Sequence, residues 1–367
     1  MSTSMNTPSN TTASTPADAA TERLMEFAGK VMGDIGSAFA TLLAFIGDQT
    51  GVFAALRDSG RCDSATLAKA AKVDARYLRE WLSAMAASAY VTYHADDDTF
   101  SLTPEQAIVF AQEGHPACMQ GLIQMVVAQM TTHDTAIEVF ASGRGRPWGE
   151  HHGCCFCATD RFFRPGYAVN LVDVWLPALE GVVAKLQQGA RVADIGCGYG
   201  ASTALMAKAF PCSTFYGFDF HAPSIAIAQA QAQKAGLANT VFETVGARDI
   251  AQDKFDLICM FDALHDMGDP VGIARHLRTR LAPDGVFMLV EPLAGDTLSE
   301  NLHVLGQLYY SASTLVCTPA SRAQEVGLAL GAQAGQKRLT EVLNEAGFSR
   351  VRRAASSDAN MVLEARI

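Results

Sequence analysis

A histidine flanked by carboxyl groups stands where an apolar run of the chain ends. The run FDLICMF stops at Phe261, and the residues after it, DALHDMGDP, place His265 between Asp262 and Asp266. Histidine has a pKa near neutrality, so it can take a proton from a hydroxyl group, and a neighbouring carboxylate can fix its tautomer. His265 and Asp266 are therefore candidate catalytic residues. The alternative is that His265 only bonds a neighbouring loop and that the Asp-Pro pair begins the next helix.

A glycine-rich turn, DIGCGYG, follows the apolar segment Val192–Ile195. Glycines at a strand-to-helix turn let the backbone approach a ligand closely, and the helix N-terminus offers free N–H groups. Dinucleotide-binding enzymes share such a turn, so the turn alone does not identify the ligand. Two acidic residues near it distinguish between the possible ligands. Asp194 stands just before the first glycine, where it can meet a cationic ammonium group rather than a pyrophosphate. Asp219 ends the next apolar segment, TFYGFD, where a carboxylate can bind both hydroxyls of a ribose.

The segments around these residues indicate how they are positioned. From Arg191 onward, apolar runs alternate with helical ones: RVADIG, ASTALMAKAF, TFYGFD, APSIAIAQAQAQKAG, TVFETV, FDLICMF, VGIARHLRTRLA and GVFMLVEP. This alternation is typical of an α/β fold with a parallel sheet covered by helices. Ligands bind beyond the carboxyl ends of such strands, so the glycine turn and His265 are expected at one edge of the sheet.

The motifs DIGCGYG, GFDFH and FDLICMFDALHDMGDP, in this order, resemble those of class I S-adenosylmethionine-dependent methyltransferases. The chain is most similar to bacterial small-molecule methyltransferases with an N-terminal winged-helix-like dimerisation domain. The resemblance implies a Rossmann-like sheet, mostly parallel with an antiparallel last strand, after a mainly helical winged-helix domain. It also implies methyl transfer from S-adenosylmethionine to a small molecule. Plant-type O-methyltransferases place a general base where His265 stands, which favours an oxygen acceptor.

The resemblance also assigns the contacts to the methyl donor. The glycine turn and the acid before it would hold the methionine part, Asp219 the ribose, and Phe220 the face of the adenine. Many relatives place an acid after the third strand for the adenine amino group, but here Gly246 stands in that place, so a backbone contact or Asp249 would substitute. The expected donor-site residues are Asp194, Gly196, Cys197, Gly198, Asp219, Phe220, Gly246, Ala247, Phe261, Asp262, Arg164 and Tyr167.

The acceptor site is expected under a helical insertion. Glu291, at the end of GVFMLVEP, and Tyr309 and Tyr310 in the segment after it are candidate substrate residues. Arg164 and Tyr167, within ATDRFFRPGY, would cover the donor, and hinge packing is the alternative for this segment. The insertion is too long for a simple connector and is typical of a lid over a pocket.

The segment HHGCCFC is a second candidate for chemistry. Its soft ligands suit zinc, copper or a thiophilic metalloid, but no second ligand pair completes a zinc site. The interpretation favoured here is free thiols and no metal. A thiol or metalloid methyltransferase using the three cysteines stays open as an alternative. The residues are His151, His152, Cys154, Cys155 and Cys157.

The sequence predicts four parts. Helices over 64–71 and 74–87, with Ser64 and Asp74 as N-caps, and a hairpin with an acidic tip form a winged-helix pattern. The predicted parts are a disordered tail at 1–20, the winged-helix-like dimerisation domain at 21–141, a linker, lid and connecting helix at 142–187, and the catalytic domain at 188–367 with a lid insertion at about 296–332.

The charge of the chain bears on its partners. The formal net charge is -10, and residues 1–100 contain 8 Lys and Arg against 12 Asp and Glu, which disfavours nucleic acid as a partner. The apolar first helix, with Phe27 and Phe39, predicts a homodimer through the N-terminal domain. A ligand-sensing winged-helix transcriptional regulator is the alternative.

Three features of the sequence predict where the protein is located in the cell. The N-terminus lacks the basic start and apolar core of a secretory signal, and no apolar run reaches the roughly 18–20 residues of a membrane span. The nine cysteines show no framework spacing. These features predict a cytoplasmic protein with free thiols and no membrane partner.

Overall fold

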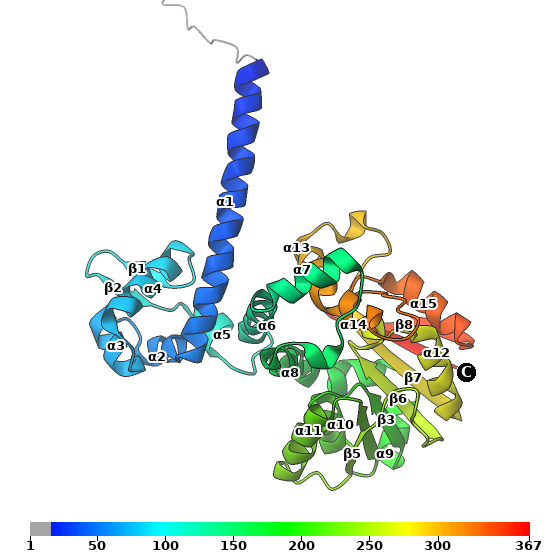
Figure 1. Cartoon of the computed structure of the whole chain (residues 1–367). Helices are drawn as coiled ribbons and strands as arrows, with labels where there is room; N and C mark the ends of the chain where they lie inside the picture. The colour runs from blue at the N-terminus through cyan, green and yellow to red at the C-terminus, as the bar shows by residue number, and fades with distance from the viewer. Residues whose placement is uncertain (1–15) are drawn as a thin grey trace, which may run out of the picture. The chain divides into compact units, whose positions relative to one another are not determined.

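The structure, a computed structural model, describes residues 16–367 and comprises two compact units (Figure 1). The first unit ends at Ala111, and the second is Gln112–Ile367. The boundary lies before residue 141, where the sequence placed the end of the winged-helix domain. The predicted disorder at 1–15 lies outside the described residues, and the next five residues of the predicted tail belong to the first helix.

The first unit has a winged-helix arrangement, as predicted. Asp63, rather than Ser64, caps its third helix by accepting a hydrogen bond from the Thr66 N–H, and Asp74 caps the fourth. Its elements are α1 (Pro16–Gln49), α2 (Val52–Ser59), α3 (Ser64–Ala71), α4 (Ala75–Ala87), β1 (Thr92–His94), β2 (Thr99–Ser101) and α5 (Pro104–Ala111).

Helix α1 is apolar but poorly covered within its unit. Every residue from Ala20 to Phe39 is exposed, and burial begins at Ala40. By length and composition, Asp18–Gln49 could cross a membrane, and the bent pair Gly153–Ala178 with Val182–Gln188 is the other candidate among the described residues. The prediction that no segment is long and apolar enough to span a membrane is therefore wrong by the criteria of length and composition.

The second unit contains the predicted alternation of strands and helices. Its elements are α6 (Gln120–Met130), α7 (His133–Ser142), η1 (Trp148–Glu150), α8 (Gly153–Asn170), η2 (Leu171–Trp175), η3 (Leu176–Ala178), α9 (Val182–Gln188), β3 (Arg191–Ile195), α10 (Ala201–Ala209), β4 (Thr214–Asp219), α11 (Ala222–Lys234), β5 (Thr240–Thr244), β6 (Phe255–Phe261), η4 (Leu264–Asp266), α12 (Pro270–Arg280), β7 (Leu281–Pro292), η5 (Ser299–Asn301), α13 (Val304–Ala312), η6 (Ser313–Cys317), α14 (Thr318–Arg322), α15 (Gly335–Glu345), β8 (Arg350–Ser356) and β9 (Asn360–Arg366).

The strands form one seven-stranded sheet in the order β5-β4-β3-β6-β7-β9-β8. All pairs from β5 to β7 are parallel, and β9 runs antiparallel to both of its neighbours. The mostly parallel sheet with an antiparallel last strand is confirmed. The chain order reverses between β3 and β6, and this switch point is where ligands bind in such sheets.

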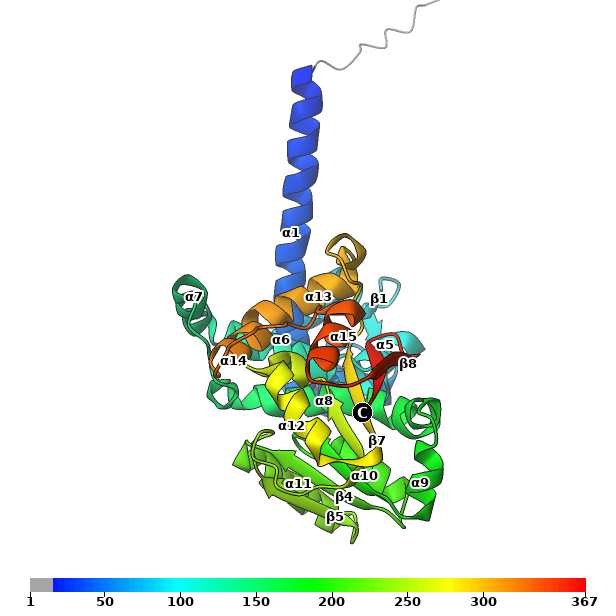
Figure 2. The same ribbon diagram turned by 90° about the vertical axis from the view of Figure 1, so that its right-hand side faces the viewer.

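Two apolar layers cover the sheet. One contains Phe287 and Leu289 of β7 with residues of α12 and α15, and the other contains Met288 and Val290 with residues of α9 and α10. Successive strand residues point to opposite faces, so a continuous apolar run serves both layers. Figure 2 shows α12 and α15 apart from α10 and α11 across the sheet.

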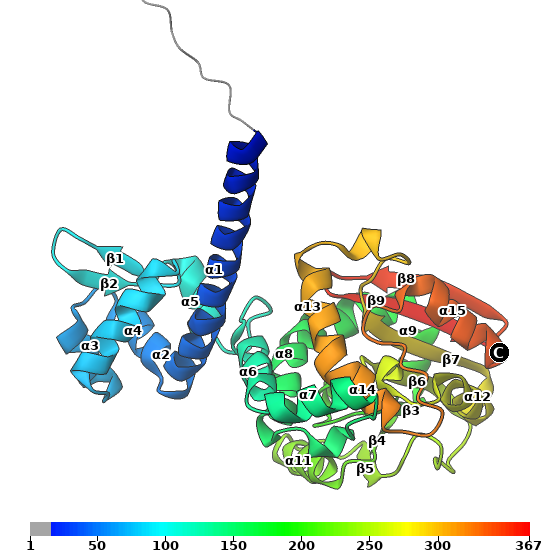
Figure 3. The same ribbon diagram turned by 45° about the horizontal axis from the view of Figure 1, so that its top comes forward.

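The segment preceding the sheet is more helical than predicted. Helix α8 begins at Gly153, because the His152 side chain accepts a hydrogen bond from the Cys154 N–H, and it continues through Pro165. The cysteine-rich segment thus lies on a helix rather than in an irregular linker. Figure 3 shows α6, α8, α13 and α14 gathered at one end of the sheet.

Candidate active site

Two adjoining cavities open at the carboxyl ends of the parallel strands. The first, about 240 Å³, is bounded by α6, α8, the β3–α10 turn, the ends of β4 and β6, and the helices from α13 to α14. The second, about 330 Å³, is bounded by the segment after β5, the start of α12 and the end of α14. Both share Gly196, Asp219, Phe220 and Trp148. They therefore form one elongated site with two lobes.

The glycine turn forms the floor of the site. Gly196, Gly198 and Gly200 all have positive φ, at 71°, 53° and 77°. A Cβ on Gly200 would lie 2.8 Å from the Phe242 ring, whereas a Cβ on Gly198 would meet nothing within 4 Å. Gly200 thus serves the contact between helix and sheet, and Gly198 leaves the backbone open to a ligand.

Asp194 lies beneath this turn rather than in the cavity. It is 1% exposed, and its Oδ2 accepts hydrogen bonds of 2.6 Å from the hydroxyls of Ser202 and Thr203. Its Oδ1 has no hydrogen-bond partner, and burial raises the pKa of Asp194 to about 6. Asp194 lines neither cavity, so the structure does not place it in direct reach of a ligand in these lobes. It holds the first turn of α10.

Asp219 ends β4 and lines both cavities. Its Oδ2 accepts a hydrogen bond from the Gly198 N–H at 3.0 Å, and its Oδ1 accepts one from the His221 N–H at 2.8 Å. Burial raises the pKa of Asp219, although these two N–H groups oppose the shift. Each oxygen can accept a second hydrogen bond, so the carboxylate can bind two adjacent hydroxyls.

The second cavity contains the other residues expected around an adenine. Phe220, Gly246, Ala247 and Asp249 all line it, as does Arg248. The Asp249 N–H donates to the Gly246 carbonyl oxygen at 2.9 Å. The segment therefore turns back on itself, and both the Gly246 backbone and the Asp249 carboxylate lie at this lobe.

Asp262 stands where β6 enters the first cavity. It has a positive φ of 49°, and its Oδ2 accepts a 2.7 Å hydrogen bond from the Tyr167 hydroxyl. Its Oδ1 accepts one of the same length from Asn360, which the sequence did not point to. Burial, followed by the charge of Glu291, raises the pKa of Asp262 to about 7.

His265 is held between two carboxyl groups, as the sequence predicted, but the principal partner is distant in sequence. Its Nδ1 lies 2.5 Å from Glu291 Oε2, and its Nε2 lies 3.3 Å from Asp266 Oδ1. Burial alone would lower the pKa of His265, but Glu291 and Asp266 raise it well above its usual range. The imidazolium, which a general base forms when it takes a proton, is thus stabilised.

Glu291 lies behind His265 and does not line either cavity. It is 1% exposed, and its Oε1 also accepts a hydrogen bond from the Leu264 N–H at 3.0 Å. It therefore positions His265 instead of contacting a substrate. Tyr310 also lies outside both cavities, whereas Tyr309 lines the first and donates its hydroxyl to the Ala359 carbonyl at 3.1 Å.

The far end of the first cavity is apolar. Arg164 and Tyr167 line the cavity as predicted, and Arg164 lies 3.4 Å from the Asp160 carboxylate. Cys317 lines it too, and burial raises the pKa of its thiol to about 12. The apolar side chains at this end are Leu122, Met125, Phe162, Phe163, Leu308 and Val316.

The cysteines of α8 do not converge on one point. Cys155 is buried against Gln129, and Cys157 accepts a hydrogen bond from Gln124. Burial lowers the pKa of His151 to about 4, and neither of its ring nitrogens has a partner. Among residues 16–367, the group that could hold a metal ion is instead His265, Asp266 and Cys317.

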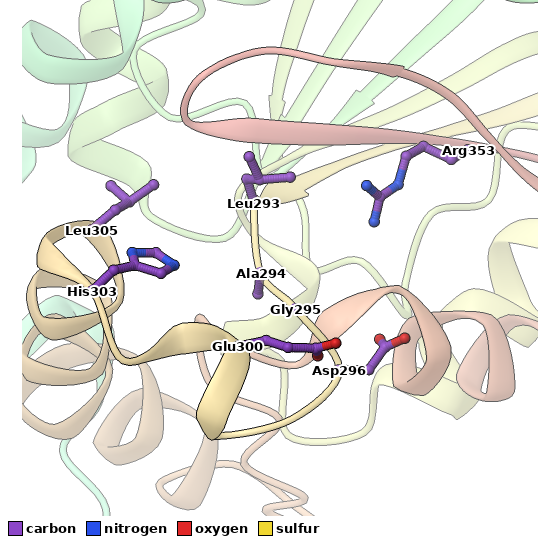
Figure 4. Close-up of a pocket in the computed structure, with 8 residues that line it drawn as sticks. All are labelled: Leu293, Ala294, Gly295, Asp296, Glu300, His303, Leu305 and Arg353. Atoms are coloured by element: carbon purple, nitrogen blue, oxygen red, sulfur yellow. The ribbon is translucent and has the colours of Figure 1, made fainter.

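A separate depression of about 310 Å³ lies beside the β7–α13 connection (Figure 4). Its polar groups serve the local backbone: Glu300 accepts from the Thr297 N–H, Asp296 from the Lys337 N–H, and His303 from the Gly306 N–H. These residues are fully explained by capping and loop closure.

The parallel sheet with its switch-point cavity, the glycine turn and the acid at the end of the second strand define a class I methyltransferase fold. Comparison with known proteins agrees. Residues 186–347 match the family model "Methyltransferase domain", and residues 38–112 match "Rv2258c-like winged HTH domain". These two matches confirm the resemblance to methyltransferases that carry an N-terminal winged-helix domain.

Individual relatives are distant. The ubiquinone biosynthesis O-methyltransferase of Paracidovorax citrulli is 28% identical over 127 residues, which cover 34% of this chain and 50% of the relative. The structure of a mitomycin 7-O-methyltransferase has a TM-score of 0.70 at 18% identity and covers 94% of this chain and 100% of its own. Human N-acetylserotonin methyltransferase, in complex with SAM, has a TM-score of 0.70 at 17% identity, covering 92% and 97%. The chain spans no more than half the length of the curated relatives it matches.

Proposed function

We propose that this protein transfers a methyl group from S-adenosylmethionine to a small-molecule acceptor. The observation that carries the proposal is the Asp219 carboxylate, which lies at the rim of a switch-point cavity with hydrogen-bonding capacity for two ribose hydroxyls. The sequence relatives named as methyltransferases support it.

The two lobes suit the two ends of the donor. The adenine occupies the second cavity against Phe220 and the Gly246–Asp249 segment. The methionine part occupies the first cavity above the glycine turn, where α10 begins. The methyl group then faces His265 and the apolar end, so the acceptor enters between α6, α8 and α13.

The acceptor atom is proposed to be oxygen, with His265 as the general base. Glu291 binds Nδ1 of His265, which leaves Nε2 on the side of Asp266. His265 and Asp266 both line the first cavity. Because Glu291 and Asp266 raise the pKa of His265, the base is the fraction of His265 that is unprotonated at Nε2. A hydroxyl that approaches this nitrogen can lose its proton as its oxygen bonds the methyl carbon. Asp266 orients the imidazole or the acceptor.

The test combines donor binding with methyl transfer. A metabolite extract is screened for incorporation of labelled methyl, and single-turnover rates with the acceptor found are compared for the wild type and His265→Gln. Loss of a general base should slow transfer by roughly 10²–10⁴-fold. A rate within about twofold of the wild type would contradict the role of His265, and calorimetry with S-adenosylhomocysteine controls for donor binding.

We also propose that α1 pairs with a second copy of the chain. Its apolar residues recur at three- and four-residue steps and stay exposed over a helix roughly 50 Å long. The stripe is Leu24, Phe27, Val31, Ile35, Phe39, Leu42 and Ile46. Light scattering should give a dimer for the wild type, and a monomer when Phe27 and Phe39 are both changed to Ser; a wild-type monomer would contradict the pairing.

The winged-helix domain is proposed not to bind nucleic acid. Arg61 pairs with Asp96 and Asp97 of the wing, and Arg79 pairs with Asp98. Both arginines are therefore already paired with the acids of the wing, which leaves less positive charge for phosphates. Salt-dependent binding to random duplex DNA would contradict this proposal and favour a regulator.

A further inference from the structure

We propose that His265, Asp266 and Cys317 form a binding site for one zinc-type divalent ion, with an open fourth position facing the first cavity. Their ligand atoms, an imidazole nitrogen, a carboxylate oxygen and the thiol sulfur, all lie within 4.8 Å of one another. All three residues also line the first cavity. Three protein ligands with an open position are typical of catalytic rather than structural zinc.

The distances suit a tetrahedral ion. Nε2 of His265 and Oδ1 of Asp266 are 3.3 Å apart, and Oδ1 has no hydrogen-bond partner although it is buried. Zinc bound to one nitrogen and one oxygen at about 2.0–2.1 Å holds these atoms about 3.4 Å apart at the tetrahedral angle. The carboxylate and the imidazole are therefore already spaced as two ligands, and the Cys317 sulfur lies within 4.8 Å of both.

Glu291 completes the arrangement from behind. It engages Nδ1 of His265 at 2.5 Å and is itself fixed by the Leu264 N–H, so Nε2 is the nitrogen that faces the ion. A carboxylate on the second nitrogen of a metal-bound histidine fixes its tautomer and raises its basicity as a ligand. Glu291 is thus a positioning residue for the ion as well as for the imidazole.

The charges also favour an ion at this point. The carboxylates of Glu291 and Asp266 lie against one histidine in a site with little access to water. When a divalent ion binds, Cys317 loses its thiol proton to solvent, and a protonated His265 also loses its Nε2 proton to solvent, so that it binds as a neutral imidazole. The two charges of the ion then balance the thiolate and the Asp266 carboxylate.

The fourth position suggests which acceptors the site takes, a point that rests on the proposed methyl transfer. A hydroxyl or thiol bound to the ion would have a lowered pKa and lose its proton to solvent. With the ion bound, His265 serves as a ligand; without it, Nε2 is free to act as the base. Cys317→Ala separates these roles, because it removes one ligand and leaves His265, Asp266 and Glu291 in place.

The experiment measures zinc on the full-length protein. Metal is removed with a chelator, and Zn²⁺ is titrated in competition with a chromophoric indicator. The wild type should bind one ion per chain, Cys317→Ala should bind it at least about 10²-fold more weakly, and Glu291→Gln about 10–100-fold more weakly. With Co²⁺ in place of zinc, a sulfur-to-cobalt charge-transfer absorption should appear in the wild type and be lost in Cys317→Ala.

Cys157→Ala is the matched control, because Cys157 lies in the cysteine-rich segment and outside the proposed site. It should keep full zinc affinity. Absence of zinc binding in the wild type, or loss of binding in Cys157→Ala but not in Cys317→Ala, would overturn the proposal.

Calorimetry with S-adenosylhomocysteine on the same samples keeps the two proposals apart. Donor binding without zinc binding overturns only the metal site, and zinc binding without donor binding overturns only the methyl transfer. Because Cys317 is buried, circular dichroism and the conservative variant Cys317→Ser test that a loss of zinc is not a loss of fold.

Discussion

The carboxyl group of Asp262 should make the stability of the protein depend on pH. It lies between the hydroxyl of Tyr167 and the amide of Asn360, each 2.7 Å away. Burial first, and the Glu291 charge second, raise its pKa from 3.8 to about 7. The change to test is Asp262→Asn, which keeps the shape and removes the ionisation.

The sign and size of this pH dependence of stability follow from the pKa of Asp262. The folded chain binds the Asp262 proton more tightly than the unfolded chain, so the protonated carboxyl stabilises the fold. This contribution is complete below pH 3.8, the unfolded value, and is lost as the pH rises through about 7. Between about pH 5 and about pH 8 the loss is about 2 to 3 kcal/mol, since one pKa unit corresponds to about 1.4 kcal/mol.

Urea unfolding at a series of pH values measures the effect. The unfolding free energy of the wild type minus that of Asp262→Asn should fall by about 2 to 3 kcal/mol from about pH 5 to about pH 8. Asp194, whose pKa is also raised by burial, contributes to both proteins and cancels in the difference. A difference that stays constant within about 0.5 kcal/mol would refute the reasoning.

Three further substitutions test other parts of the site. Glu291→Gln should slow single-turnover methyl transfer by about 10²-fold or more, because an amide opposite Nδ1 selects the wrong tautomer of His265. The affinity for the donor should not change. The control is Glu364→Gln, at another buried glutamate of the sheet, which should keep the wild-type rate. Asp219→Ala should weaken S-adenosylhomocysteine binding in calorimetry by about 10²-fold or more, as two hydrogen bonds to a charged group are lost; equal affinity would speak against the ribose contact. Ser202→Ala removes the hydroxyl that donates a 2.6 Å hydrogen bond to Asp194. It should lower the free energy of unfolding, measured in urea, by about 1 to 3 kcal/mol. Unchanged stability would show that this hydrogen bond does not stabilise the fold.

The sequence predicted those parts of the fold that depend on local patterns. Apolar runs on both faces of the strands and the glycine turn indicated the parallel sheet and its switch point, and Gly198 and Asp219 lie there. Helix α8 was missed because glycines and Pro165 in that segment are typical of turns. The His152 cap and the burial of the helix outweigh those local preferences.

The sequence pointed to His265 and Asp266 at the site but not to the residues that support them. His265 and Asp266 are neighbours in sequence, whereas Glu291 and Cys317 reach His265 only through the pairing of β6 with β7 and the turn of the lid. Sequence spacing carries no signal for such contacts. Asp194 differs from these residues. The sequence predicted a contact with the donor from its place before the glycines, but its hydrogen bonds go to the hydroxyls of α10.

The central claim is that the cavity at the ends of β3, β4 and β6 binds a sulfonium nucleoside and its demethylated product. Isothermal titration calorimetry of the full-length protein with S-adenosylmethionine and S-adenosylhomocysteine tests it directly. We predict one molecule bound per chain, with the heat of binding strongly reduced in Asp219→Ala. No heat with either compound, under conditions where the chain is folded, would contradict it.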